Sequence, residues 1–287
     1  MALRCMKPLP RSDWASWGRV CSRPSKPTSR LGLVRSKLGC PTLAAAGAVG
    51  VACRRGRGKR SCSGIPAAAA PGFRELLTFW FGPEIFTERQ RLDDIGYLRE
   101  RSKMWYMSGT KYDQAAKEFL PLLQMYDPSD FSALVDESVE QNLAKVVLFD
   151  QIPRNAYRGT AEAFRFDEAA CVVSNALLKS SFASTCSAAE LLCAVQPLAH
   201  AEGPGDSRIQ LGIRMLQENM GRYPEEASKM IFQAILSHDA HGAVLRRFGR
   251  YPHRNLQLGR ESTPEELSWL NSADCPGWAR SQMSQKK

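Results

Sequence analysis

The chain has 287 residues, a formal net charge of +10 and 44% hydrophobic residues, a length and composition that allow a buried globular core. Its positive charge is concentrated at one end. Residues 1–66 hold ten Arg, four Lys and one acidic residue, Asp13, so the remaining residues carry 25 basic and 28 acidic side chains. A body with a slight negative charge has no electrostatic reason for broad binding to nucleic acid or to an anionic membrane.

Residues 1–66 are rich in Arg, Ser, Ala and Pro, which is typical of a transit peptide for a plastid or a mitochondrion. The alternative is a cytoplasmic protein. The uncharged stretch Leu38–Cys53 is too short and too weakly apolar to span a membrane. The basic run Arg54–Arg60 is interpreted as part of the targeting sequence, and 67–72 as a linker.

The rest of the chain is predicted to be all-α, with about eight or nine helices packed as antiparallel pairs over 73–272. Apolar residues recur at steps of three and four. They are expected to share faces in three helical segments: Val135, Val139, Leu143, Val146 and Val147; Ile209, Ile213, Leu216 and Met220; and Ala227, Ile231, Ala234, Leu245 and Phe248. Residues 273–287 are expected to form a flexible C-terminal tail.

Helix starts are marked by capping residues. Ser187 with Glu190 and Thr263 with Glu266 have the spacing of a capping box, in which a hydroxyl and a carboxylate each accept a backbone N–H. Thr160 is a third predicted cap. Turns are predicted at 127–128, 152–153, 203–205 and 251–252, where Pro or Gly interrupts the pattern.

No string typical of a cofactor or metal enzyme occurs: GxxxxGKS/T, GxGxxG, HExxH and GxSxG are all absent, so neither a cofactor nor a metal is expected. His238 and His241 have a spacing that could hold a metal, but both fall in an apolar stripe and are interpreted as histidines at the edge of the core. Cys171, Cys186 and Cys193 fall among apolar residues and are expected to be buried free thiols, which fits a reducing compartment.

Three polar clusters stand at predicted turns, and their members are the candidate ligand-binding residues: Asp150, Arg154, Asn155, Arg158, His200, Glu202, His241, Arg250, His253, Arg254 and Asn255. One interpretation is structural, since Asp and Asn cap helix ends and Arg binds free carbonyls. The other is a shared pocket, in which guanidinium groups bind a carboxylate or phosphate and a histidine next to a carboxylate transfers protons.

The strings FDQIPRNAYRGT, QPLAHAE and RRFGRYPHRNLQLGREST, together with LLTFWFG near the start of the helical region, resemble the family known as domain of unknown function 924. The resemblance extends over residues 73–270. It implies a helical fold like that of tetratricopeptide domains, and no reaction is attached to it. One departure is Ala201, where the family usually has Ser between the residues matching His200 and Glu202.

Three hypotheses about function follow. The first is a non-enzymatic binding or scaffold module for an acidic peptide, a small anion or another protein partner. The second is a metal-independent hydrolase or transferase, in which His200 or His253 is the general base, oriented by Glu202 or Asp150, and Arg154 and Arg254 bind the anion. The third makes the clusters purely structural. The second requires these side chains to meet in one pocket.

Overall fold

The computed structural model describes residues 71–203 and 205–283, and the predicted leader of residues 1–66 lies outside them. Within these residues the chain is helical and has no strand, as predicted, and nine of its α-helices have seven residues or more. These are α2 (Phe73–Phe81), α4 (Ile95–Tyr106), α7 (Val139–Val146), α9 (Asp167–Lys179), α11 (Ala188–His200), α12 (Ser207–Met220), α13 (Glu225–Phe248), α14 (Pro264–Leu270) and α15 (Gly277–Met283).

Short elements connect these helices. They are α3 (Glu84–Thr87), α5 (Asp113–Ala116), α6 (Leu120–Leu123), α8 (Ile152–Ala156) and α10 (Phe182–Thr185), the 3-10 turns Arg89–Asp93, Lys117–Phe119, Phe131–Ala133, Ala161–Phe164 and Pro252–Arg254, and the π turn Val147–Gln151. No helix in the described part of the chain combines the length and apolar character needed to cross a bilayer.

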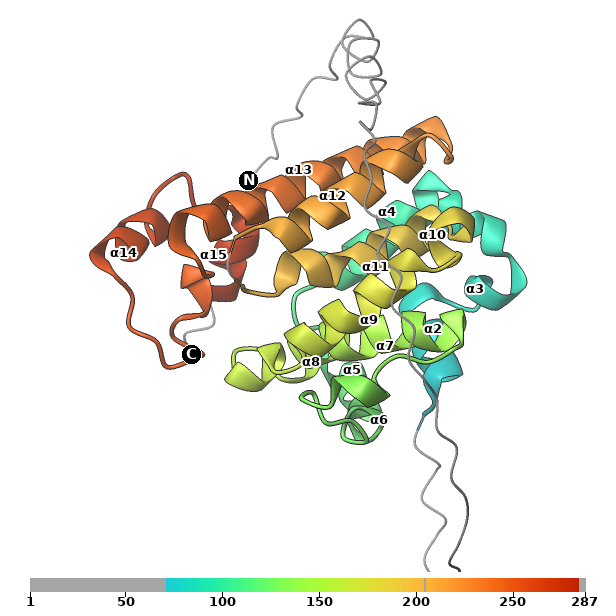
Figure 1. The fold of residues 1–287 in the computed structure, drawn as a ribbon, viewed down its shortest axis with the longest axis horizontal. Helices are drawn as coiled ribbons and strands as arrows, with labels where there is room; N and C mark the ends of the chain where they lie inside the picture. The colour runs from blue at the N-terminus through green and yellow to red at the C-terminus, as the bar shows by residue number, and fades with distance from the viewer. Residues whose placement is uncertain (1–70, 204, 284–287) are drawn as a thin grey trace, which may run out of the picture. The chain divides into compact units, whose positions relative to one another are not determined.

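Consecutive long helices pack against one another: α7 on α9, α9 on α11, α11 on α12, and α12 on α13 (Figure 1). Helix α11 has neighbours on several sides and is buried nearly all round, so its sequence is apolar rather than amphipathic. Helix α12 buries one face, through Ile209, Ile213 and Leu216. Small residues such as Ala194 allow close approach, and the Ser174 hydroxyl on α9 donates to the Ala194 carbonyl at 2.5 Å.

Both capping boxes form as predicted. The Ser187 hydroxyl accepts from Glu190 N at 3.3 Å while the Glu190 carboxylate accepts from Ser187 N at 2.8 Å. Thr263 and Glu266 exchange the same pair of bonds at 3.1 and 2.8 Å. The prediction for Thr160 is wrong in detail: it precedes a 3-10 turn, and its hydroxyl donates backwards to the Tyr157 carbonyl.

The apolar pattern over 135–147 predicted too long a buried face. Helix α7 begins only at Val139, after the cap Ser138, whose hydroxyl accepts from Gln141 N. Val135 and Val139 are therefore 40% and 36% exposed, although the later residues of the pattern are buried.

The predicted turn at Ile152-Pro153 is also wrong. The chain stays helical from α7 through the π turn into α8. Proline has no N–H for the carbonyl four residues back, and its ring crowds that carbonyl. The wider π turn directly before α8 accommodates Pro153 without breaking the helix. Asp150 and Gln151 lie in this turn.

The stretch expected to be a flexible tail contains α15, which packs against the turn Pro252–Arg254. Cys275 and Ala279 are fully buried, and Trp278 stacks on His241 with 3.9 Å between ring centroids. This segment therefore contributes side chains to the domain.

Candidate functional site

A cavity of about 390 Å³, called here the central cavity, brings together residues from α4, the π turn, α8, α11, α13, the turn Pro252–Arg254 and α15. Seven of the eleven candidate residues line it: Arg154, Asn155, Arg158, His200, His241, His253 and Arg254. Segments as far apart in sequence as Trp105 and Trp278 thus contribute to one site. Three of the four histidines of the chain are among them.

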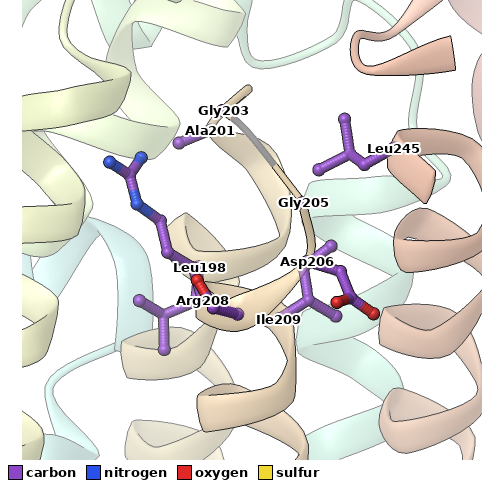
Figure 2. A pocket seen from close by; sticks show the side chains of 9 residues that line it. Leu198, Ala201, Gly203, Gly205, Asp206, Arg208, Ile209 and Leu245 are labelled. Atoms are coloured by element: carbon purple, nitrogen blue, oxygen red, sulfur yellow. The ribbon is translucent and has the colours of Figure 1, made fainter.

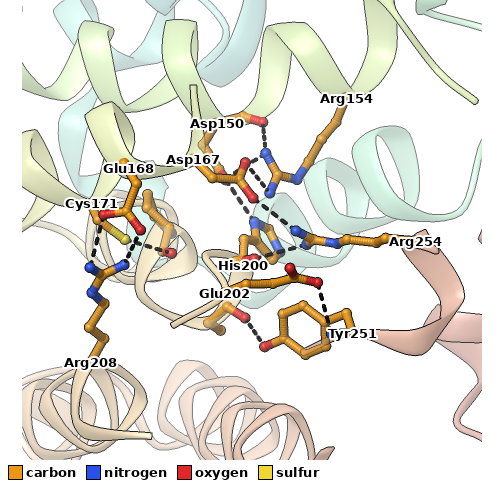
Figure 3. Close-up of polar contacts among 12 residues, drawn as sticks. Asp150, Arg154, Asp167, Glu168, Cys171, His200, Glu202, Arg208, Tyr251 and Arg254 are labelled. Carbon is orange, nitrogen blue, oxygen red and sulfur yellow. Dashed lines mark hydrogen bonds and ion pairs between the residues drawn. The ribbon is translucent and has the colours of Figure 1, made fainter. Parts of the chain in front are cut away.

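Three guanidinium groups line the cavity, and their carboxylate partners do not. Arg158 binds Asp113 with two bonds, both 2.8 Å long. Arg154 lies 3.0 Å from Asp150 and 2.8 Å from Asp167, and Arg254 donates to the other oxygen of Asp167 at 2.9 Å (Figure 3). No Asp or Glu of the described residues lines the cavity, so its wall is positive although the cluster as a whole is balanced.

The π turn places Asp150 so that it faces two partners at once. Its side chain is fully buried and receives the His200 Nδ1–H at 2.8 Å as well as the Arg154 guanidinium. Burial opposes ionisation, but the charge of Arg154 and the hydrogen bonds from His200 and Gln151 outweigh it and hold the pKa of Asp150 at about 2. The side chain of Arg154 also donates to the Asp150 backbone carbonyl at 2.7 Å. The carboxylate is therefore ionised at neutral pH.

His200 lines the cavity, and its ring contacts Asp150, which does not line it (Figure 3). Because an ionised carboxylate only accepts hydrogen bonds, Nδ1 must carry the proton in the neutral ring, and Nε2 has the lone pair. Among the described residues, no partner contacts Nε2, and the side chain is 18% exposed. Its backbone carbonyl is fixed by Arg254, which donates to it at 2.8 Å. The orientation of the His200 ring is thus fixed, and Nε2 can accept a hydrogen bond or a proton from a bound molecule.

His241 is the second imidazole whose tautomer the structure defines. Its Nδ1–H donates to the Ser237 carbonyl at 2.7 Å, which leaves the lone pair on Nε2. Burial lowers the pKa of His241 to about 3, and the nearby His200 contributes to the same shift. The ring centroids of His200 and His241 are 6.2 Å apart. His241 is therefore neutral at physiological pH.

The remaining candidates do not line the cavity. Glu202 accepts from Tyr251 N at 2.8 Å and pairs with Arg260 at 2.6 Å, so it does not orient His200. Arg250 pairs with Glu266 at 2.7 Å, and Asn255 donates to the same carboxylate at 3.1 Å. These three residues hold the segment after α13 in place, which agrees with the structural interpretation for them.

His238 lies outside the cavity, with its ring nitrogens 2.9 Å from the Ala234 carbonyl and 3.3 Å from the Val195 carbonyl. No group of His, Cys, Asp or Glu in the described residues is arranged to hold a metal ion. The four described cysteines are free and buried, as predicted for Cys171, Cys186 and Cys193. Burial raises the pKa of the Cys171 thiol to about 12, so it stays protonated.

A smaller pocket of about 130 Å³ lies at the start of α12 (Figure 2). Its charged side chains already have partners: Asp206 pairs with Arg246 and accepts from Gln210 at 3.0 Å, and Arg208 binds Glu168 with two bonds of 2.7 and 2.8 Å. The larger cavity is therefore the better candidate site.

Some residues of the site were not predicted. Asp113 and Asp167 stand in the first turns of helices, where an acid is expected to interact with the helix dipole alone. Four aromatic residues of the cavity wall, Trp105, Tyr106, Phe164 and Trp278, have no sequence signal that separates them from core residues.

Comparison with solved structures finds "Structure of Protein of Unknown Function ATU0120 from Agrobacterium tumefaciens", at 24% identity and a TM-score of 0.43, over 69% of this chain and 96% of that one. No curated protein matches the chain. The family described as "Bacterial protein of unknown function (DUF924)" matches residues 76–274, which include every candidate residue of the central cavity. The chain belongs to this family.

Proposed function

We propose that the central cavity binds a small organic anion. The observation that carries this proposal is the orientation of the ion pairs around it: Arg154, Arg158 and Arg254 line the cavity, and the carboxylates that balance them do not. A negative group in the cavity lies closer to the guanidinium groups than to those carboxylates. Guanidinium groups bind carboxylate and phosphate with two parallel hydrogen bonds.

The volume favours a small molecule over a peptide. A cavity of about 390 Å³ lies in the range of small-molecule sites, which is roughly 300–1,000 Å³. Amide side chains from Gln151, Asn155, Gln196 and Gln257 add neutral polar groups to its wall. A scaffold for a folded partner would need a larger and flatter contact surface.

Arg158 is the guanidinium group best suited to a test. Its side chain is 31% exposed, whereas the Arg154 and Arg254 side chains are 16% and 5% exposed and hold Asp167. Arg158→Gln removes one cation of the cavity and leaves the buried ion pairs of Asp167 with Arg154 and Arg254 intact. The matched control is Arg208→Gln, because Arg208 binds Glu168 with the same two-bond geometry outside the central cavity.

The test measures the melting temperature of the full chain, and the affinity by calorimetry, with benzoate, succinate and inorganic phosphate. At least one anion is expected to bind. Arg158→Gln should weaken it by roughly ten- to a hundredfold, the value of a hydrogen bond to a charged group, while Arg208→Gln leaves affinity unchanged. Absence of binding by all three anions, or an equal loss in both variants, would refute the proposal.

A second function, metal-independent catalysis, is favoured by the pairing of His200 with Asp150 at 2.8 Å. The carboxylate fixes the tautomer and stabilises the imidazolium that forms when Nε2 takes a proton. His200 would then act as general base on a bound hydroxyl or a water molecule, in a hydrolase or transferase. The contact between His200 and Asp150 supports His200 as the base in this second proposal.

Catalysis is tested separately from binding, with ethyl and thioethyl esters of whichever acid binds. His200→Gln should leave the affinity for the free acid within about threefold and lower the hydrolysis rate by roughly a hundredfold or more, the usual contribution of a general base. The control is His238→Gln, outside the cavity. Hydrolysis that is equally fast in wild type and His200→Gln would exclude the role of His200 as the base.

A further inference from the structure

Aromatic side chains form much of the wall of the central cavity. Trp105 and Tyr106 come from the end of α4, Phe164 from the turn Ala161–Phe164, and Trp278 from α15. Trp105 is rigidly placed, because it stacks on Trp80 with 4.1 Å between centroids and donates its indole N–H to the Trp80 carbonyl at 2.9 Å. Such walls favour a ligand with a flat ring, since ring faces stack on ring faces or meet their edges.

His241 supplies a hydrogen-bond acceptor of fixed position. Its Nδ1–H is committed to the Ser237 carbonyl, and its ring lies flat against Trp278, with an interplanar angle of 11°. Rotating the ring by 180° would break the hydrogen bond to the Ser237 carbonyl. The low pKa of His241 keeps the ring neutral, so Nε2 accepts hydrogen bonds but does not donate them. A matching ligand carries a donor, such as a hydroxyl or amino group.

We infer that the ligand of the central cavity is a small aromatic carboxylate with a hydroxyl or amino group on its ring. This inference rests on the proposed function, because the carboxylate is assigned to the guanidinium groups. The ring is assigned to the aromatic wall and the donor to His241. The carboxylate, the ring and the donor group of the ligand are each assigned to a different set of side chains, so each assignment can be tested separately.

Trp278, in the C-terminal helix α15, contributes to the preference for an aromatic ligand. It lies beyond residue 274, where the match to the family ends, yet it lines the cavity and covers one face of His241. It is only partly buried, and α15 contacts mainly the turn Pro252–Arg254. A change at Trp278 should therefore alter which ligands bind without removing a residue of the main core.

The experiment compares three acids of similar size on the full chain by calorimetry: the better-binding isomer of hydroxybenzoate, benzoate, and cyclohexanecarboxylate. Hydroxybenzoate should bind roughly three- to tenfold more tightly than benzoate, the value of one net hydrogen bond. Benzoate should bind more tightly than cyclohexanecarboxylate, because the saturated ring is not flat. Equal affinities for all three acids would overturn the inference.

Two variants test the hydrogen-bond acceptor and the aromatic wall separately. His241→Phe keeps a flat ring for Trp278 but lacks the acceptor, so hydroxybenzoate should lose its advantage over benzoate. Trp278→Leu should reduce the preference for benzoate over cyclohexanecarboxylate and leave succinate binding unchanged. If succinate binds as tightly as hydroxybenzoate, the anion site stands and the aromatic ligand is refuted. If no anion binds at all, the proposed function fails as well.

Discussion

Asp167 is the carboxylate that two guanidinium groups share, and its replacement by Asn is expected to be the most damaging single charge change in the domain. Its oxygens lie 2.8 Å from Arg154 and 2.9 Å from Arg254, and its side chain is 9% exposed. The amide has nearly the same shape but no charge. Asp167→Asn therefore leaves Arg254 facing a neutral amide and removes one of the two carboxylates next to Arg154, which keeps Asp150.

The expected cost follows from burial. Removing one partner of a buried ion pair costs about 3–5 kcal/mol, because the remaining charge stays out of water without compensation. A domain of this size is stable by about 5–15 kcal/mol, so this loss is a large fraction of the total. Replacing Arg254 by Met in the same chain removes the cation that loses its paired carboxylate. The double variant should thus lose less than the sum of the single losses.

The next residue in sequence provides the control. Glu168 binds Arg208 with two bonds of 2.7 and 2.8 Å, but both side chains are exposed, at 50% and 41%. An exposed pair contributes about 0–1 kcal/mol, so Glu168→Gln should have a small effect. Urea unfolding followed by circular dichroism gives both free energies of unfolding, provided that the denaturant slope is unchanged. Free energies of unfolding that agree within 1 kcal/mol for the two variants would refute the argument that burial decides the cost.

Three further outcomes are expected. Unfolded His241 takes up a proton below about pH 6.5, but in the folded protein it does so only near pH 3. The free energy of unfolding should therefore fall as the pH is lowered from about 6.5 to about 3. Its dependence on pH should be shallower in His241→Phe by up to about 1.4 kcal/mol per pH unit; equal slopes in pH-dependent urea titrations would contradict this. Thr263→Ala should cost about 1 kcal/mol of helix-cap energy, whereas Thr160→Ala, which caps no helix, should change the urea midpoint little. Alkylation of Cys171 and Cys193 by iodoacetamide should be far slower in the native protein than in urea, because burial keeps both thiols protonated; fast native labelling would show that these thiols are accessible.

Features set by neighbouring residues could be predicted from the sequence. The all-helical fold follows from the spacing of apolar residues, and the caps at Ser187 and Thr263 follow from a partner three residues away. The prediction of a turn from a single proline was wrong where the surrounding helix continues through it. Pro153 was predicted to form a turn, but the surrounding helix accommodates it by widening.

Pairings between distant residues could not be predicted. Seven candidate residues do gather in one cavity, but the sequence offered Glu202, two residues from His200, as readily as Asp150, fifty residues away. Only the packing of α11 against the π turn decides between them. Trp278 was assigned to a tail because nothing local shows that a tryptophan after a Pro-Gly step folds back onto His241.

The π turn Val147–Gln151 also determines how the chain tolerates changes in length. Removing one residue from it would give a regular α-helix, with the usual bond pattern restored. Because a π turn holds one residue more than an α-helical turn, the deletion would leave the following helix close to its place and would change the faces on which the remaining side chains of the turn lie. Asp150 and Gln151 would then be displaced from His200 and from the cavity wall, and the Pro153 ring would crowd the carbonyl four residues before it. The number of residues in this turn is therefore tied to the site, as is the side chain of Asp150.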